Sequence, residues 1–151
     1  MKLTVNKIKR LLNLYPPYLG AGIKVEFVRD DWKEMHVSMK LKWYNRNIVG
    51  THFGGSLYSM IDPHLMLMLM NLLGDDYIIW DKSAEIEFIK ATKNKVISKM
   101  RITDDDIREI KINVEKNKKY LADFIVEIKD EEGSLIAKAK KIIYVRKKKN
   151  R

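Results

Sequence analysis

The sequence predicts an α+β fold in which one buried helix is wrapped by a curved antiparallel sheet, with a short helix at the N-terminus. Two observations predict it: an apolar helical run in the middle of the chain, and segments on both sides of it in which apolar and polar residues alternate. Alternation of period two indicates strands with one buried and one solvated face. A layered α/β fold would need helices between successive strands, and the order of the segments does not offer them.

The N-terminal part predicts a short helix followed by a pair of strands. Apolar residues at helical spacing occupy residues 2 to about 13, and the predicted helix ends before the proline pair at 16–17. Residues 23–27 and 35–41 then alternate, and residues 30–32 between them are typical of a hairpin connection. The two strands are therefore expected to be antiparallel.

The central run, residues 50–74, begins as a glycine-bearing loop and continues as a helix that is apolar on almost every side. Such a helix is expected to be wrapped rather than docked on one face. Pro63 should either kink the helix or make Asp62 a second cap, and both outcomes free backbone polar groups near Asp62. The run carries this carboxylate into the predicted core, where an ionisable group is unfavourable unless it is paired or functional.

The rest of the chain predicts four more strands and a brief helix. Strands are expected at 77–88 and 96–102, and Thr103 with Asp106 forms a capping-box pattern that opens the helix. The last two strands, 120–128 and 135–145, are joined by a loop that ends in a glycine. The expected boundaries are one domain over residues 1–146 and a basic tail over residues 147–151.

Composition limits the environment and the partners. The chain has no cysteine, which excludes disulfides and thiolate sites, and its N-terminus lacks the pattern of a signal peptide, so we expect a cytoplasmic protein. The apolar run is too short to span a bilayer, which needs roughly 20 consecutive apolar residues. The formal charge of +10 favours an anionic partner, and much of it lies between Lys138 and Arg151. The simplest interpretation of that basic end is a solvated terminus.

One motif resembles a known family. Gly50-Thr-His-Phe-Gly-Gly-Ser-Leu-Tyr-Ser-Met-Ile-Asp62 resembles the G-x-x-H-G-G-x-x-x-x-x-x-D signature of PaaI-type hotdog thioesterases, and residues 15–23, 80–84 and 144–146 are similar to the branch related to the C-terminal domain of YiiD. The resemblance implies a hotdog fold, a homodimer whose sheets join, often a tetramer, and an acyl-CoA thioester bound at the dimer interface. It implies acyl-CoA as the substrate and no cofactor.

The resemblance also implies roles for individual residues. Asp62 falls on the catalytic carboxylate, Gly54 on the residue whose backbone N–H holds the thioester oxygen, and Asn47 on the asparagine near the attacking water. Four further residues are predicted to contact the substrate: His52, Phe53, Gly55 and Asp81. Asp81 is expected either to pair with Lys82 at an interface or to face the site from the partner subunit.

The chemistry of thioester hydrolysis fits these residue types. A carboxylate can act as the base that activates the attacking water, or it can act as the nucleophile itself. The reaction also needs hydrogen-bond donors aimed at the developing oxyanion, and the N–H groups at a helix N-terminus are such donors. The structural alternative is that Gly54 and Gly55 only permit tight packing while Asp62 only caps a helix.

One residue departs from the family pattern, because Phe53 stands where the family has a histidine and His52 is displaced by one position. This departure favours a second hypothesis, a non-catalytic acyl-CoA-binding or lipid-binding protein. A nucleic-acid-binding protein is the third and least favoured hypothesis, since no RNP-like pattern accompanies the positive charge. His52, His64 and Asp62 match no known metal motif, so we expect no metal site and hydrogen-bonded structural histidines.

Overall fold

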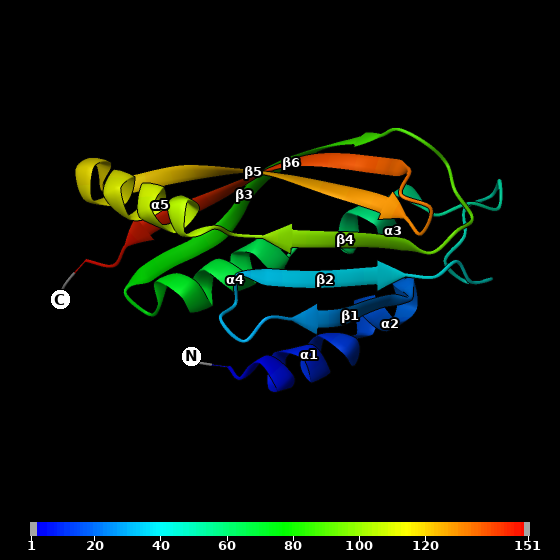
Figure 1. The fold of residues 1–151 in the computed structure, drawn as a ribbon, viewed down its shortest axis with the longest axis horizontal. Helices are drawn as coiled ribbons and strands as arrows, with labels where there is room; N and C mark the ends of the chain where they lie inside the picture. Colours follow the sequence, from blue (N-terminus) through cyan, green and yellow to red (C-terminus); the bar gives the residue numbers. More distant parts are fainter. Residues whose placement is uncertain (1–2, 150–151) are drawn as a thin grey trace.

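The computed structural model describes residues 3–149 and has the predicted α+β architecture. A six-stranded antiparallel sheet in the order β1-β2-β4-β5-β6-β3 packs on the central helices, which is the arrangement expected for a hotdog fold (Figure 1). The elements in chain order are α1 (Val5–Asn13), α2 (Pro16–Ala21), β1 (Ile23–Val28), β2 (Glu34–Met39), α3 (Gly54–Ser59), α4 (His64–Leu73), β3 (Tyr77–Phe88), β4 (Val96–Arg101), α5 (Asp104–Asn117), β5 (Lys119–Asp130) and β6 (Leu135–Lys147).

The N-terminal helices lie along β1 at one edge of the sheet (Figure 1). Helix α1 begins after Thr4, whose side chain accepts a hydrogen bond from the N–H of Lys7. Helix α2 is an addition to the predicted elements: it starts at the proline pair, because proline is favourable in the first turn of a helix, and Gly22 ends it with a φ of 75°. Residue 2 of the predicted helix, and residues 150 and 151 of the predicted tail, lie outside the described residues.

The central run forms two helices instead of one. Pro63 is the N-cap of α4, so the predicted cap at Asp62 is wrong, and residues 60–63 form a turn between α3 and α4. The N–H of Leu67 donates to the carbonyl of Pro63 at 3.0 Å, which places the carbonyl of Asp62 just outside the hydrogen bonds of α4. The predicted release of a backbone polar group near Asp62 is therefore confirmed.

Helix α4 is buried along one side and not all round. Its buried residues are His64, Leu65, Met68, Leu69 and Leu73. Met70 is 47% exposed, so the prediction of a helix wrapped on every side is wrong for the single protomer. The prediction that Asp62 is carried into the core is wrong as well, because its side chain is 48% exposed. The sheet covers one side of these helices and leaves the other side open.

The predicted strand pairs and the capping box are confirmed. β1 and β2 are antiparallel, with Val25 opposite Val37, and β5 and β6 form the last hairpin. Thr103 and Asp106 make both bonds of the capping box, and the helix that they open is longer than the predicted brief one because its fourteen residues pack against β5 and β6. None of the helices within residues 3–149 has both the length and the apolar content that a membrane crossing needs.

Candidate functional site

The inner face of β6 carries a lysine among apolar residues. Ala139 and Ile143 are buried on either side of Lys141, and the side chain of Lys141 has no exposed surface. The interpretation of this lysine as part of a solvated basic end is therefore wrong. The alternation of residues along β6 could have predicted this burial, because alternate residues of a strand share one face and Lys141 shares its face with Ala139 and Ile143. A buried ammonium group is unfavourable unless it is paired.

Two carboxylates and one carbonyl surround this ammonium group. Nζ of Lys141 forms ion pairs with Oδ1 of Asp81 at 2.8 Å and with Oδ1 of Asp62 at 3.2 Å. It also donates a hydrogen bond to the main-chain carbonyl of Asp62, the group released by the break between α3 and α4. The ring of Tyr58 lies 5.6 Å from Nζ. We call these four residues, Tyr58, Asp62, Asp81 and Lys141, the Lys141 cluster.

A β-bulge brings Asp81 into the cluster. Asp81 lies opposite the inward-facing Ile143, and the register of β3 against β6 shifts between Asp81 and Ser83. After the shift, Ile86 lies opposite the buried Ala139. In a regular strand Asp81 and Ile86 would face opposite sides, because residues an odd number apart do so. The bulge allows both to face the core, and bulges are common next to active sites.

Asp62 uses one carboxylate oxygen for the protein and keeps the other free. The hydroxyl of Tyr58 donates to Oδ1 of Asp62 at 2.9 Å, and Lys141 also contacts Oδ1. Among the described residues, Oδ2 accepts no hydrogen bond. Asp62 lines a groove of about 480 Å³ whose walls include Leu11, Tyr15 and Leu67. A carboxylate oxygen is thus available at the side of a largely apolar groove.

The groups beside the cluster are held in one protonation state at neutral pH. His64 is fully buried, and its Nε2 lies 2.9 Å from the hydroxyl of Tyr18. Burial, and then the charge of Lys141, lowers the pKa of His64 to about 3, so its ring is neutral. Burial and the hydrogen bond to Asp62 raise the pKa of Tyr58 to about 12. Burial also raises the pKa of Tyr18, and it raises the pKa of Asp81 against the opposing effect of Lys141.

Gly54 lies at the start of α3 in a second cavity, of about 330 Å³. The first N–H groups of a helix have no partner inside the helix, so the Gly54 amide can bind a ligand. A β-carbon on Gly54 would lie 3.1 Å from Cζ of Phe88, so the ring of Phe88 covers this backbone closely. A β-carbon on Gly55 would lie 2.6 Å from the ring of Phe53, which is itself 56% exposed.

Asn47 and His52 line the same cavity, and both side chains are hydrogen-bonded to other parts of the protein. The side chain of Asn47 donates to Thr51 Oγ1 and to the carbonyl of His52, and it accepts from the N–H groups of Val49 and Thr51. These four bonds use its full capacity, so in this protomer Asn47 organises the loop before Gly54. His52 Nε2 lies 2.8 Å from the carbonyl of Asn94, which agrees with the predicted structural histidine, and burial lowers its pKa.

The predicted site residues therefore fall into two groups in the protomer. Asn47, His52 and Gly54 share one cavity, and Asp62 lines another. Asp81 joins Asp62 through Lys141, so its ion-pair partner is Lys141 and not Lys82. Within residues 3–149, no group of three or more His, Cys, Asp or Glu side chains has the geometry to hold a metal ion.

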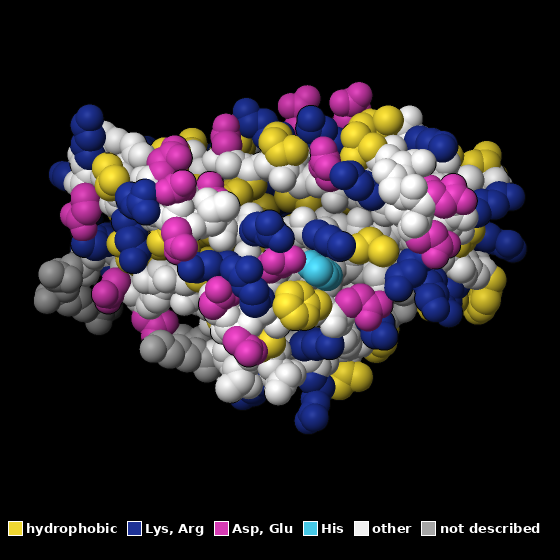
Figure 2. Space-filling view, in the orientation of Figure 1, with side chains coloured by type: hydrophobic (Ala, Val, Ile, Leu, Met, Phe, Trp, Pro, Cys, Tyr) yellow, Lys and Arg dark blue, Asp and Glu magenta, His cyan; other side chains and the backbone are white. Residues whose placement is uncertain are grey.

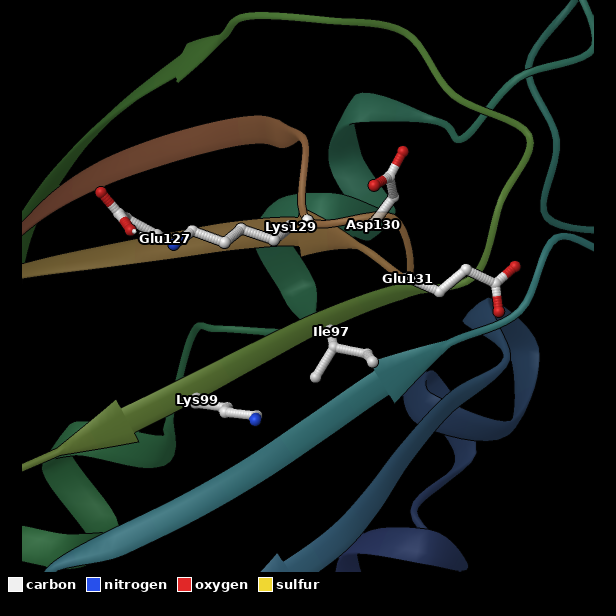
Figure 3. Close-up of a pocket in the computed structure, with 7 residues that line it drawn as sticks. Ile97, Lys99, Glu127, Lys129, Asp130 and Glu131 are labelled. Atoms are coloured by element: carbon white, nitrogen blue, oxygen red, sulfur yellow. Dashed lines mark ion pairs between the residues drawn. The ribbon is translucent and has the colours of Figure 1, made fainter.

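Charged residues outside the Lys141 cluster are distributed differently from one part of the surface to another. On the face shown in Figure 2, Lys and Arg side chains are interspersed with Asp and Glu. A cavity of about 380 Å³ between β4 and β5 follows the same pattern, with Lys129 paired to Glu127 at 3.4 Å (Figure 3). Lys119, Arg146 and Lys148 line a separate cavity beside Tyr144.

The chain is similar to a family of unassigned function and to several solved structures. Residues 6–145 match the family described as a domain of unknown function, DUF4442. Among curated proteins, no sequence matches the chain. A Pseudomonas aeruginosa protein described as a probable thioesterase is 16% identical, with a TM-score of 0.83 over 98% of this chain and 99% of that chain.

Two further structures extend the comparison. A thioesterase from Haemophilus influenzae is 11% identical, with a TM-score of 0.69 over 97% of this chain and 93% of that chain. A protein of unknown function from Chlorobaculum tepidum is 14% identical, with a TM-score of 0.74 over 97% of this chain and 98% of that chain. At these identities the similarity establishes the hotdog fold and leaves the activity to the residues of the site.

Proposed function

We propose that this chain, which belongs to the DUF4442 family, is a hotdog thioesterase that hydrolyses an acyl-CoA to the free acid and CoA. The observation that carries the proposal is the state of Asp62: Lys141 and Tyr58 hold its Oδ1, while Oδ2 is free beside an apolar groove. A carboxylate held in this way can activate a water molecule for attack on a carbonyl carbon.

The proposed reaction uses Asp62 as a general base. Oδ2 takes a proton from water as the water oxygen bonds to the thioester carbon, and the carbonyl oxygen becomes negative. The backbone N–H of Gly54 stabilises that oxygen, helped by the dipole of α3. The carbon–sulfur bond then breaks, the sulfur leaves as the thiol of CoA after taking up a proton, and the acid is released. Direct attack by Asp62 on the thioester carbon is the alternative route, through an anhydride that water cleaves.

The separation of Gly54 from Asp62 supports a site shared between two copies of the chain. The two residues line different cavities of one protomer, so a second copy is needed to bring a Gly54 amide to an Asp62 carboxylate. Among the described strands, β3 is an edge strand that pairs with β6 alone, and a long unpaired edge favours joining to another chain. We therefore propose a homodimer joined along β3, which can pair further into a tetramer.

The groove beside Asp62 supports an acyl chain as the group that is bound. Leu11, Tyr15 and Leu67 line it, and burying an apolar chain against such side chains is favourable by roughly 25 cal/mol per Å². The same lining suits a fatty or an aromatic acyl group. No cofactor enters the proposed reaction, and the basic groups near the C-terminal end are available to the phosphates of CoA.

A non-catalytic acyl-CoA-binding protein is the second candidate. It is favoured by one observation: Phe53 replaces the histidine of the thioesterase signature, and the imidazole of His52 is engaged by the carbonyl of Asn94. This candidate would use the same groove and the same dimer without turnover.

Release of free thiol from a panel of acyl-CoAs, measured for the native protein and for Asp62→Asn, tests the proposal. We expect turnover by the native protein and a loss of about 100-fold or more in the variant. Asp123→Asn is the matched control, since Asp123 is an exposed partner of Lys140. Undiminished turnover in Asp62→Asn would refute the assigned role. Tight acyl-CoA binding without turnover would instead identify the binding protein, and salt-sensitive nucleic-acid binding alone would identify the third class.

A further inference from the structure

We propose that Lys141 is the positioning residue of Asp62: it fixes the carboxylate through one oxygen, so that the other oxygen can accept the proton of water. The inference rests on the proposed function, because it assigns Lys141 to the reaction that Asp62 performs. Lys141 lies outside every motif of the thioesterase signature.

The burial of Lys141 is the first argument for a role beyond packing. Apolar residues occupy the neighbouring inward positions of β6, among them Ala139 and Ile143. Replacing a buried ion pair by apolar residues of similar volume is often neutral or stabilising. Packing of the core therefore does not explain why a lysine occupies this position, and its charge requires a separate explanation.

The geometry of the contacts is the second argument. Lys141 binds Asp62 at two points, the main-chain carbonyl and Oδ1 of the side chain. Two points of attachment restrict both the backbone at the break and the rotation of the side chain. Tyr58 donates to the same Oδ1, so the restraint leaves Oδ2 as the reacting oxygen. Holding a catalytic group in one geometry lowers the barrier of the step that it serves.

Charged and titratable groups face the cluster from several elements. Asp81 faces Lys141 from β3, Tyr58 faces it from α3, and His64 and Tyr18 approach from α4 and α2. The histidine is neutral and both tyrosines are protonated at neutral pH. Among the described groups that face the cluster, Lys141 is thus the cation shared by the two carboxylates.

The first experiment compares Lys141→Met with Lys140→Met. Lys140 is the adjacent lysine, exposed and paired with Asp123, so its variant controls for the loss of a positive charge on the same strand. We expect Lys141→Met to lower kcat by about 10- to 100-fold, with a much smaller change in KM. Lys140→Met should change neither.

A second variant separates positioning from charge balance. Lys141→Met combined with Asp81→Asn removes one cation and one anion together, so the net charge of the cluster is the same as in the native protein. The double variant also replaces Lys141→Met in the test if the single variant fails to fold. If Lys141 positions Asp62, kcat stays low in the double variant. A return of kcat to the native value would overturn the proposal, because Lys141 would then serve only to neutralise Asp81.

Restoring the amine provides the rescue. The chain has no cysteine, so in Lys141→Cys a single thiol can be alkylated with 2-bromoethylamine in urea, which rebuilds a primary amine through a thioether, before refolding. Iodoacetamide gives a neutral control adduct. We expect the amine adduct alone to recover kcat, and equal recovery by both adducts would refute the proposal. Full turnover in Asp62→Asn would instead refute the proposed function, whatever Lys141 does.

Discussion

Lys141 and Asp62 are 79 positions apart in the chain, yet Lys141 binds both the main-chain carbonyl and the side chain of Asp62. The contact depends on two local irregularities. The break before Pro63 frees the carbonyl, and the bulge in β3 adds Asp81 as the second partner of the ammonium group. This buried and doubly paired ammonium group therefore lies where two elements depart from regular geometry.

The Lys141 cluster predicts a large difference in stability between two adjacent lysines. Lys141→Ala leaves two carboxylates without their cation and a cavity in the core, so the free energy of unfolding should fall by about 3–5 kcal/mol. Lys140→Ala removes an exposed ion pair with Asp123 and should change it by about 0–1 kcal/mol. Urea unfolding of both variants at neutral pH measures the difference. Equal changes in the free energy of unfolding would show that the ion pairs of Lys141 contribute no more stability than the exposed pair of Lys140.

His64 predicts a loss of stability on mild acidification. Its folded pKa of about 3 lies below the ordinary value of 6.5, so the unfolded chain binds the extra proton. The contribution is fully present above about pH 6.5 and is lost as the pH falls toward 3, at up to about 1.4 kcal/mol per pH unit. Between pH 6.5 and pH 5 the unfolding free energy of His64→Asn should fall less steeply than that of the native protein. Parallel curves for the two proteins would contradict the assignment of this proton to His64.

Two glycine substitutions should differ in their effects. Gly54→Ala places a β-carbon 3.1 Å from the ring of Phe88, beside the amide proposed to hold the thioester oxygen, so we expect a loss of thioester turnover. Gly20 lies in α2 with no heavy atom within 4 Å of the corresponding position, and Gly20→Ala should stabilise by about 0.4–1 kcal/mol. Thermal unfolding and the thiol-release assay on both variants check this, and an unaffected Gly54→Ala protein would remove the argument for close approach at that amide.

The shared site predicts complementation between two inactive variants. Gly54→Val and Asp62→Asn should each be inactive as homodimers. When they are unfolded together in equal amounts and refolded, half of the dimers are mixed and each mixed dimer holds one intact site. The mixture should therefore recover about a quarter of the native rate. Recovery requires Gly54 and Asp62 to come from different subunits, so a mixture that stays inactive while mixed dimers form would place both residues in one protomer.

Local sequence patterns predicted most of the fold. The alternation around Val25 and Val37 predicted a hairpin, and Thr103 with Asp106 predicted the start of α5. These features depend on residues a few positions apart in the chain, so they can be predicted from the sequence. The signature ending at Asp62 predicted the hotdog fold and led to the groove where the free carboxylate oxygen lies.

The sequence by itself determined where most strands lie along the chain, the central apolar run and the acid within it. Only the tertiary structure decided that the run divides into α3 and α4, that Asp62 is half-exposed, and that Lys141 joins it to Asp81. It also decided that Gly54 and Asp62 line separate cavities. The physical reason is range: periodicity and capping act within one element, whereas a buried charge finds its partners only after distant elements have packed together.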